Sequence, residues 1–496
     1  MSDTIALNHP HVAHADRFFI GGEWVAPSSG STIQVITPST EELYATVAEA
    51  QEADIDRAVA AAREAFDHGP WPRMSHAERA KYLQAIARAI IARTGDLATI
   101  WTSEVGALRS AGDYSAPSAA GAYDYYASLA DSFAFEERHT PQTGGTGLLV
   151  REPVGVVAAI IPWNGPLGLI TWKCAPALLA GCTVIVKPSP EAPGAAYIMA
   201  EIMAEIGLPK GVFNVVTADR EVSELLVRHP GVDKVTFTGS SAAGKRIASL
   251  CGERIARCTL ELGGKSAGII LDDYDLGKAA KSIAGSARMM TGQVCSSLTR
   301  IIVPRHRHDE LLDAMGAAFS AIKVGDPFDR TMEMGPLAMK RQRDRVEMYI
   351  AKGKAEGATV AAGGGRPKHL DRGYFVEPTV FGNVDNNMTI AREEIFGPVV
   401  SVIPADSEEQ AIAIANDTVF GLNASVFTND SDRAYAIARD IRAGTVGHNG
   451  FKTDFSIAFG GFKQSGLGRE GGTEGLLPFL EAKTVILDNP PSHLKE

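Results

Sequence analysis

Three residues along the chain have the types that nucleophilic, oxyanion-stabilising and acid–base chemistry requires. Cys295 follows Gly292 in a loop before an apolar run, a position that suits a nucleophile, although a buried inert thiol is the alternative. Asn164 follows an apolar run, where its amide can stabilise an oxyanion or cap its own turn. Glu261 lies in an apolar run before paired glycines, where burial raises a carboxyl pKa and favours activation of water. A salt bridge to Lys265 is the alternative for that carboxylate.

Two further motifs have the features of a dinucleotide site. Gly239 and Ser240 lie between a strand and a helix start, where a pyrophosphate binds, although the run is not GxGxxG. Glu394 stands two residues before Phe396 and a Gly-Pro pair, so a carboxylate can hold a ribose diol while an aromatic ring covers the cofactor. A solvated acidic surface is the alternative for this second motif.

Apolar runs alternate with helical patterns, which predicts two α/β units that would position these residues. The first unit has strand-like runs at 154–161, 182–186, 212–216 and 234–238, with helices near 194–206, 219–229 and 242–250. Strands of the second unit are expected near 266–271, 299–304, 358–362, 376–384, 397–404, 423–428 and 445–448. Its helices are expected near 275–290, 307–321, 340–356, 407–416 and 431–441. Ligands of such parallel sheets bind at the carboxyl ends of the strands.

Other local patterns are weaker. The uncharged stretch 154–172 is interrupted by Pro162 and Pro166, so we expect a buried strand and a turn, not a membrane span. Capping-box patterns at 75–78 and 407–410 predict two helix starts. The polar segment 131–150 is expected to be a loop or hairpin, and 484–487 a terminal strand that needs a partner edge, either in this chain or on another subunit.

Composition excludes several classes of protein. The chain has 496 residues, a net charge of −11 and a pI of about 5.6, which predicts two or three globular domains and no nucleic-acid partner. Its five cysteines show no CxxC spacing, which favours a reducing compartment and no zinc site. The first 17 residues lack a signal-peptide pattern, and we interpret His9, His11 and His14 as part of a solvated tail, not as metal ligands.

Together these motifs resemble one family, the NAD(P)-dependent aldehyde dehydrogenases, from about Phe19 to Gly466. The resemblance rests on the ordered set Pro162-Trp163-Asn164, Glu261 to Ser266, Gly292 to Cys295 and Glu394 to Pro398. It implies an α/β fold with a Rossmann-type cofactor domain (1–130 and 151–260), an α/β catalytic domain (261–470) and a small β-element for oligomerisation (131–150 and 471–496). It also implies a cytoplasmic homodimer or homotetramer that acts on a small-molecule aldehyde, without membrane or metal.

The resemblance assigns roles residue by residue. Cys295 is the expected nucleophile, Asn164 and the Cys295 backbone N–H form the oxyanion hole, and Glu261 activates the water that hydrolyses the thioester. Cofactor contacts are expected from Ile161, Pro162, Trp163, Lys187, Ser189, Gly239, Ser240, Leu262, Glu394 and Phe396. Substrate contacts are expected from Gly165, Gly168, Leu169, Trp172, Val294, Ser296, Phe455 and Phe459. The other four cysteines are expected to be structural.

Three departures from the family pattern affect cofactor and substrate. NAD is the favoured cofactor, but many members have Pro-Ser-Glu after the lysine and here Glu191 comes one residue later, so NADP stays open. Arg220 stands where many members have a glycine-rich turn, and it can approach a 2′-phosphate or simply begin a surface helix. Gly165 and Gly168 replace bulky tunnel residues, which favours aromatic or long-chain aldehydes unless neighbouring side chains fill the space.

Two other enzymatic functions and one non-enzymatic function compete with this prediction. A CoA-acylating dehydrogenase would resolve the thioester with CoA, but Glu261 favours water. A thiol hydrolase that uses Cys295 alone would need no nicotinamide. A non-catalytic protein on the same fold is disfavoured by the intact Cys295, Asn164 and Glu261.

Overall fold

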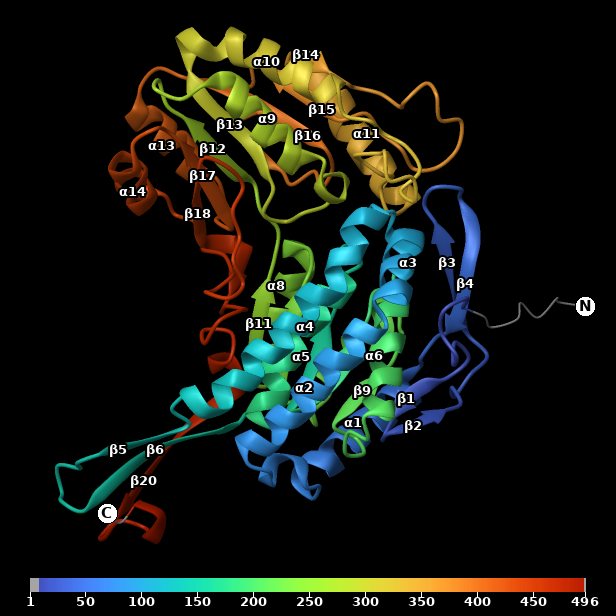
Figure 1. Ribbon diagram of the computed structural model, residues 1–496, viewed down its shortest axis with the longest axis vertical. Helices are drawn as coiled ribbons and strands as arrows, with labels where there is room; N and C mark the ends of the chain where they lie inside the picture. The colour runs from blue at the N-terminus through green and yellow to red at the C-terminus, as the bar shows by residue number, and fades with distance from the viewer. Residues whose placement is uncertain (1–8, 495–496) are drawn as a thin grey trace, which may run out of the picture.

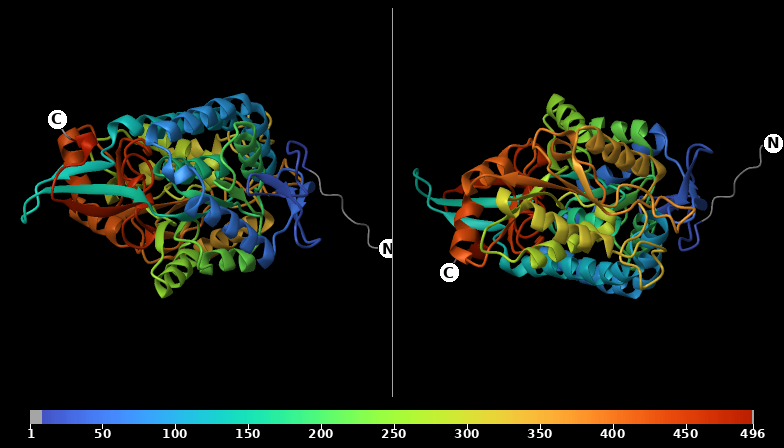
Figure 2. Two further views of the ribbon diagram at one scale, coloured as in Figure 1. Left: turned by 90° about the horizontal axis from the view of Figure 1, so that it is seen from below. Right: turned by 90° about the horizontal axis from the view of Figure 1, so that it is seen from above.

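The computed structural model describes residues 9–494, whose two large sheets lie one above the other along the long axis (Figure 1). The first has eight strands in the order β19-β11-β10-β7-β8-β9-β1-β2, and the second has seven in the order β14-β15-β16-β13-β12-β17-β18. A three-stranded sheet, β20-β6-β5, extends away from the body, as the views in Figure 2 also show. The hairpin of β3 (Thr32–Thr37) and β4 (Glu42–Ala48) completes the strands.

Five parallel strands form the centre of the first sheet: β7 (Val156–Ile160), β8 (Thr183–Lys187), β9 (Phe213–Val215), β10 (Lys234–Thr238) and β11 (Arg257–Glu261). The hairpin of β1 (Phe18–Ile20) and β2 (Glu23–Val25) is antiparallel at one edge, and β19 (Gly466–Leu467) at the other. The chain runs outward from β7 in both directions, first through β8 and β9 and later through β10 and β11. This reversal of strand order beside β7 is the place where a doubly wound sheet binds its ligand.

Helices cover both faces of the first sheet because its strands are apolar on both sides. Along β7, Val157 and Ala159 pack on one face with α2 (His76–Ala92), α4 (Arg109–Ser132), α5 (Pro166–Ala180) and α6 (Gly194–Glu205). Val156, Ala158 and Ile160 pack on the opposite face with α1 (Glu52–Asp67), α7 (Arg220–Arg228) and α8 (Ser241–Glu253). Burying one such Val or Ile side chain contributes about 1.5–3 kcal/mol. The remaining helix of this half, α3 (Thr94–Val105), packs against α4 and α6.

The second sheet is parallel except at its β14 edge. Its strands are β12 (Ser266–Ile270), β13 (Leu298–Pro304), β14 (Thr359–Ala362), β15 (Thr379–Gly382), β16 (Val399–Ala405), β17 (Asn423–Phe427) and β18 (Thr445–His448). One face is covered by α9 (Leu276–Ala287) and α10 (His308–Ser320). The other is covered by α11 (Lys340–Ala355), the short α12 (Thr389–Arg392), α13 (Glu408–Asn416) and α14 (Ser431–Asp440).

The alternation predicted from the sequence is confirmed, but stretch 154–172 is only partly a strand and turn. Its second half begins α5 at Pro166, which occupies the first helical position, where a missing N–H costs nothing. The capping box at Ser75 is confirmed, because Ser75 and Glu78 bond reciprocally. At Ser407 only half of it forms: the Ser407 hydroxyl accepts from the Gln410 N–H, while the Gln410 side chain accepts from the Asp406 N–H.

Both ends of the described part of the chain contact other elements. His9 is buried and its Nε2 lies 3.0 Å from Glu104 Oε1, so the prediction of a solvated histidine tail is wrong for this residue. The ring of His14 packs on Trp24. At the other end, β20 (Leu480–Leu487) pairs antiparallel with β6 (Thr146–Pro153), and β6 pairs with β5 (Glu136–His139), so the terminal strand finds its partner edge within its own chain.

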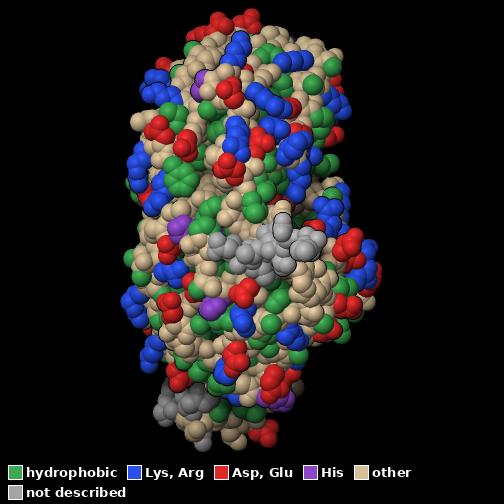
Figure 3. All heavy atoms as spheres, turned by 90° about the vertical axis from the view of Figure 1, so that its right-hand side faces the viewer, with side chains coloured by type: hydrophobic (Ala, Val, Ile, Leu, Met, Phe, Trp, Pro, Cys, Tyr) green, Lys and Arg blue, Asp and Glu red, His purple; other side chains and the backbone are tan. Residues whose placement is uncertain are grey.

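The surface agrees with an acidic globular protein. On the face shown in Figure 3, Lys and Arg side chains are interspersed with Asp and Glu side chains, without a broad basic area. Among residues 9–494, no helix has both the length and the apolar composition that crossing a bilayer requires.

Candidate active site

The Cys295 loop is held in an unusual backbone conformation next to the segment that carries Phe396. Met290 and Thr291 have φ values of 46° and 57°, and Gly292 has a φ of 70°. A Cβ atom at Gly292 would lie 2.3 Å from the carbonyl carbon of Gly397, so only glycine fits this approach. The loop then turns into β13 with Cys295 partly accessible and Ser296 buried behind it.

The amide of Asn164 lies beside this loop. Asn164 follows β7, and its Nδ2 donates to the backbone carbonyl of Gln293 at 3.0 Å. Its own carbonyl accepts from Trp101 Nε1 at 2.8 Å, which fixes the turn. A Cβ on Gly264 would lie 2.4 Å from the Cys295 carbonyl oxygen, so the segment after β11 also reaches the loop. The structure therefore brings together the ends of β7 and β11 and the cysteine loop.

Glu261 is a buried carboxylate without a hydrogen-bond partner in the described structure. It ends β11 with 2% of its surface exposed, and neither side-chain oxygen has a partner. Burial raises its pKa well above the ordinary value, and the like charge of Glu470 adds to this, while Lys173 and Arg469 oppose it. The alternative of a salt bridge to Lys265 is not observed, because the Lys265 ammonium is itself buried without a hydrogen-bond partner.

The surroundings of Cys295 favour its protonated thiol over the thiolate, because they raise its pKa. Close packing of protein atoms raises its pKa to about 12, even though part of the side chain stays accessible. The carboxylates of Glu394 and then Glu261 raise it further, while the backbone N–H groups of Ser296 and Cys295 lower it. Both carboxylates thus act on the same sulfur, and the thiolate needs a base or an added positive charge in order to form.

A buried charged pair next to Glu261 was not found from the sequence. Lys173 on α5 donates to Glu470 and, at 2.7 Å, to the hydroxyl of Thr238. The side chains of the pair are 0% and 4% exposed, and one oxygen of Glu470 stays without a partner. Burial is the largest cause of the raised Glu261 pKa, Glu470 raises it further, and Lys173 opposes this effect. Lys173 and Glu470 are 297 residues apart, and no local pattern joins them.

Predicted cofactor residues line the ends of β7, β8 and β10. Ile161 donates its N–H to the Lys187 carbonyl at 2.9 Å, with Pro162 and Trp163 following it. Lys187 is 7% exposed, and burial lowers its pKa to about 8. The Gly239 N–H donates to the Glu261 carbonyl, and the Ser240 hydroxyl accepts the Ala243 N–H and so begins α8. A helix start beside a lysine favours a bound anion such as a pyrophosphate.

The predicted cofactor residues form a row along these strand ends. Glu394 and Phe396 lie at its other end, near Cys295. The Gly264 N–H donates to Glu394 Oε1 at 3.1 Å, and a Cβ on Gly263 would lie 2.2 Å from Oε2. The paired glycines therefore form a cradle that a larger residue would fill. Burial raises the Glu394 pKa to about 7 against the opposing effects of Gly264, Lys265 and Arg345. Phe396 meets Trp163 edge to face, with ring centroids 5.3 Å apart.

This row of residues fits a nicotinamide dinucleotide. It offers a buried lysine at the end of β8, a helix start after β10 and a carboxylate in a glycine cradle beside the nucleophile. A diol, a pyrophosphate and a second ribose need donors and acceptors of these kinds. Leu262 lies under the row, with its N–H bonded to the Ser465 carbonyl.

The predicted substrate residues form an aromatic wall and an open space. Phe455 stacks between Trp172 and Phe459, with centroid distances of 4.7 and 4.4 Å. The space beside Gly165 and Gly168 is open, because a Cβ added at either position would meet no heavy atom within 4 Å. Neighbouring side chains therefore do not fill these two positions. Leu169 and Val294 are partly exposed and complete the set.

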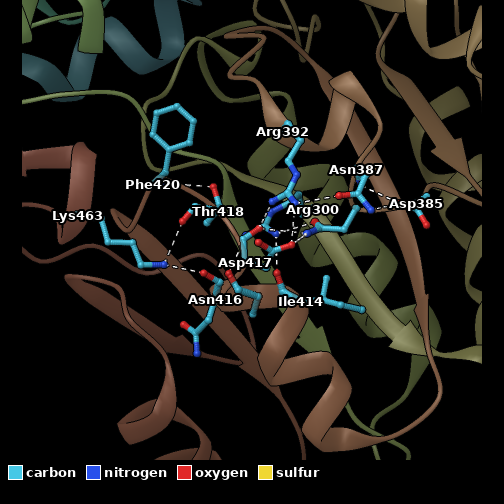
Figure 4. Close-up of polar contacts among 12 residues, drawn as sticks. Arg300, Asp385, Asn387, Arg392, Ile414, Asn416, Asp417, Thr418, Phe420 and Lys463 are labelled. Carbon is cyan, nitrogen blue, oxygen red and sulfur yellow. Dashed lines mark hydrogen bonds and ion pairs between the residues drawn. The ribbon is translucent and has the colours of Figure 1, made fainter.

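A hollow of about 510 Å³ on the second sheet lies away from these residues, at the side chains drawn in Figure 4. Asp417, on its wall, accepts from Arg392 and Asn386 at 2.8 and 2.9 Å. Buried Arg300 donates to the carbonyls of Ile414 and Lys265 at 2.8 and 3.0 Å. These contacts hold the backbone at the start of β12, so we interpret the network as support for the active-site segment.

The chain is similar to known proteins over nearly its whole length. The model of the aldehyde dehydrogenase family matches residues 24–485. The chain is 46% identical over 484 residues to geranial dehydrogenase of Castellaniella defragrans, covering 97% of this chain and 100% of that one. It superposes with a TM-score of 0.93 on an aldehyde dehydrogenase of Mycobacterium tuberculosis complexed with NAD+, at 47% identity over 95% and 98% of the two chains. This chain also superposes with a TM-score of 0.93 on a mutant aldehyde dehydrogenase C of Pseudomonas syringae in complex with NAD+ and octanal. The identity is 40%, over 98% of this chain and 99% of that chain.

Proposed function

Because the chain belongs to the aldehyde dehydrogenase family, we propose that Cys295 is its nucleophile and that bulky or long-chain apolar aldehydes are its substrates. The reaction is the oxidation of an aldehyde to a carboxylic acid, with NAD as the cofactor. The observation that supports the site most strongly is the convergence of Asn164, Glu261 and the Cys295 loop at the ends of β7, β11 and the loop before β13.

In the proposed acylation step, Cys295 gives its proton to solvent, and its sulfur attacks the carbonyl carbon. The oxyanion that forms is stabilised by the Asn164 amide and the Cys295 backbone N–H, and one such donor contributes roughly 3–4 kcal/mol to the transition state. When bound, NAD supplies the acceptor for the hydride that leaves the same carbon. Loss of the hydride converts the thiohemiacetal into a thioester on Cys295.

In the proposed deacylation step, Glu261 takes a proton from water, and the resulting hydroxide attacks the thioester. The C–S bond breaks, the carboxylic acid leaves and the thiolate is restored. A carboxyl with a raised pKa is a better base toward water than an ordinary one. Lys173 and Glu470 tune that basicity in opposite directions.

The substrate class follows from the space beside Gly165 and Gly168 and from the aromatic wall. Absence of two side chains leaves room for a long or bulky apolar group, and Trp172, Phe455 and Phe459 offer an apolar surface to it. One similar protein is named a geranial dehydrogenase, and another was solved in complex with octanal. Both names agree with a long apolar group on the substrate.

The test is an initial-rate comparison of acetaldehyde, octanal and an aromatic aldehyde with NAD. We expect kcat/KM to rise strongly with the size of the apolar group, and a clear preference for acetaldehyde would reject this substrate class. Product analysis with and without CoA belongs to the same experiment. Carboxylic acid as the product in both cases supports water activated by Glu261, and an acyl-CoA would reject that role.

We also propose a cytoplasmic homodimer or homotetramer assembled through segments 131–150 and 471–496. The extended β5-β6-β20 sheet supports this, because the outer edge of β20 has no strand partner within residues 9–494 and Ile486 on it is 59% exposed. We propose that residues 1–130 and 151–260 bind the cofactor and that residues 261–470 carry out catalysis. Light scattering of the intact chain and of a variant truncated after residue 479 tests the assembly, and an unchanged mass would reject it.

A further inference from the structure

The turn between α8 and β11 brings two cysteines together. Cys251 lies in the last turn of α8, and Cys258 lies at the start of β11. The Ala256 N–H donates to the Cys251 carbonyl at 2.9 Å, and the Ile255 N–H donates to the Gly252 carbonyl at 3.3 Å. These are the two hydrogen bonds of a Schellman motif, which ends a helix and reverses the chain. Strand β11 therefore starts beside the last turn of the helix.

This turn is held firmly by the residues around it. Ile255 occupies the left-handed position of the motif with a φ of 58°, where glycine is usual and a β-branched residue is strained. Its side chain is 80% exposed, so burial of that side chain does not offset the strain. The Arg254 guanidinium donates to the carbonyls of Val232 and Val227 at 2.5 and 3.1 Å and fixes the turn to the segment before β10. The two cysteines are therefore held in a set arrangement.

The two thiols are in direct contact. Because side chains alternate along a strand, Ala256 and Cys258 lie on the same face of the sheet, and both pack in one apolar cluster with Cys251. The Cys251 and Cys258 side chains are hydrogen-bonded to each other, and both are free thiols. Cysteines whose side chains meet across a short turn satisfy the geometric requirement for a disulfide.

The two members of this pair differ in reactivity. Cys258 is partly accessible, whereas Cys251 is 1% exposed. The hydrogen bond from Cys251 lowers the pKa of Cys258, and the Lys234 ammonium lowers that pKa further, while burial opposes both. The same hydrogen bond raises the pKa of Cys251, and burial adds to this. Cys258 is therefore the member that an oxidant reaches as a thiolate, with a protonated thiol directly behind it.

The other cysteines lack these features. Burial raises the pKa of Cys174 and of Cys182, and it also raises the pKa of Cys295. The pair is also separate from the candidate active site. Glu261 ends β11, whereas Cys258 lies at the start of that strand, and Cys251 lies at the opposite end of α8 from the predicted pyrophosphate site.

We propose that Cys251 and Cys258 form a redox-active dithiol, which hydrogen peroxide converts into a reversible disulfide. The Cys258 thiolate attacks one peroxide oxygen, the O–O bond breaks and hydroxide leaves, which gives a sulfenic acid on Cys258. The hydroxide takes up the proton that the Cys258 thiol released. The Cys251 sulfur then attacks the Cys258 sulfur, the S–O bond breaks, and water leaves with the Cys251 proton. The peroxide is reduced to water while the thiols are oxidised, and a dithiol reductant reverses the step. This site is additional to the proposed aldehyde oxidation.

The test uses the unaltered, NAD-free protein, an equimolar amount of hydrogen peroxide and then iodoacetamide. Trypsin cleaves after Arg254 and Arg257 and so separates the two cysteines into different peptides. We expect both cysteines to lose alkylation together and a cross-linked peptide pair to appear, about 2 Da lighter than the sum of the two thiol peptides. Dithiothreitol should restore both alkylated peptides. Without peroxide, Cys258 should react with iodoacetamide about tenfold faster than Cys182 at pH 7.

Two variants separate the roles of the pair. Cys251→Ser should still be oxidised at Cys258, but the product should be a sulfenic or sulfinic acid without a cross-link. Cys182→Ser is the matched control, because Cys182 is another buried free thiol of the same α/β unit. Its removal should leave the yield of the cross-linked peptide unchanged.

Three results would overturn the proposal. These are full alkylation of both cysteines after peroxide, oxidation of Cys258 in the unaltered protein with Cys251 still alkylated, or a cross-link that forms only after unfolding in urea. The measurement involves neither aldehyde nor NAD. A wrong assignment of Cys295 or Glu261 would therefore leave it unaffected, and the two failures can be told apart.

Discussion

Replacing Gly165 by leucine should convert the enzyme's substrate preference. Gly165 is the N-cap of α5, with φ −141° and ψ 61°, a backbone that other residues adopt, and its Cβ would meet nothing within 4 Å. A Cβ at this position has room, and we expect the isobutyl group to extend into the open space. The leucine side chain should occupy the room of about three methylene groups of a long substrate. Each methylene group that can no longer be buried costs about 0.8 kcal/mol of binding free energy. The total lowers kcat/KM for octanal roughly 50-fold.

Acetaldehyde is too short to use the same space, so its kcat/KM should change less than threefold. Gly252→Leu is the matched control, because Gly252 is exposed on α8 and its Cβ would also meet nothing within 4 Å. Initial rates of NADH formation at saturating NAD give both constants. Equal losses for octanal and acetaldehyde, or no loss for octanal, would refute the argument that Gly165 opens the substrate space.

Three further predictions concern the catalytic residues. Cys295→Ala should abolish oxidation while the NAD dissociation constant stays within threefold; retained turnover would refute the assignment of the nucleophile. Asn164→Ala should lower kcat by roughly 10²–10³ through loss of one oxyanion donor, with the fold unchanged by circular dichroism, and a smaller loss would argue against that role. Glu470→Gln removes a like charge that raises the Glu261 pKa, so that pKa should fall and the acidic limb of the kcat–pH profile should move to lower pH. A shift to higher pH would contradict the electrostatic account.

The strand and helix pattern was predictable because most elements carry strong periodicity and clear boundaries. Runs such as 156–160 are apolar on both faces, which is typical of a parallel strand covered on both sides. Helix α5 was missed because Gly165, Pro166, Gly168 and Pro176 all weaken a helix pattern, although a proline at the first helical position costs nothing. Burial of the whole segment in the first core supplies the stability that its local propensity lacks.

The residues that we propose as catalytic could be singled out because each lies in a short motif, whereas their surroundings depend on contacts between distant parts of the chain. The pairing of Lys173 with Glu470 and that of Glu191 with Arg341 arise only after the two sheets pack together. His9 looked like part of a polar tail, but its contact with buried Glu104 requires α3 to be in place. The open space at Gly165 likewise could not be told from a filled one without its neighbours.

A mass measurement on Glu261→Gln tests the central chemistry most directly. The variant should still transfer hydride but lose the base that activates water, so one NADH per site should form in a burst. Intact-protein and peptide mass spectra after mixing with NAD and octanal should then show an added acyl group on the peptide that contains Cys295. Steady turnover at the unaltered enzyme's rate with no such adduct would contradict the division of labour between Cys295 and Glu261.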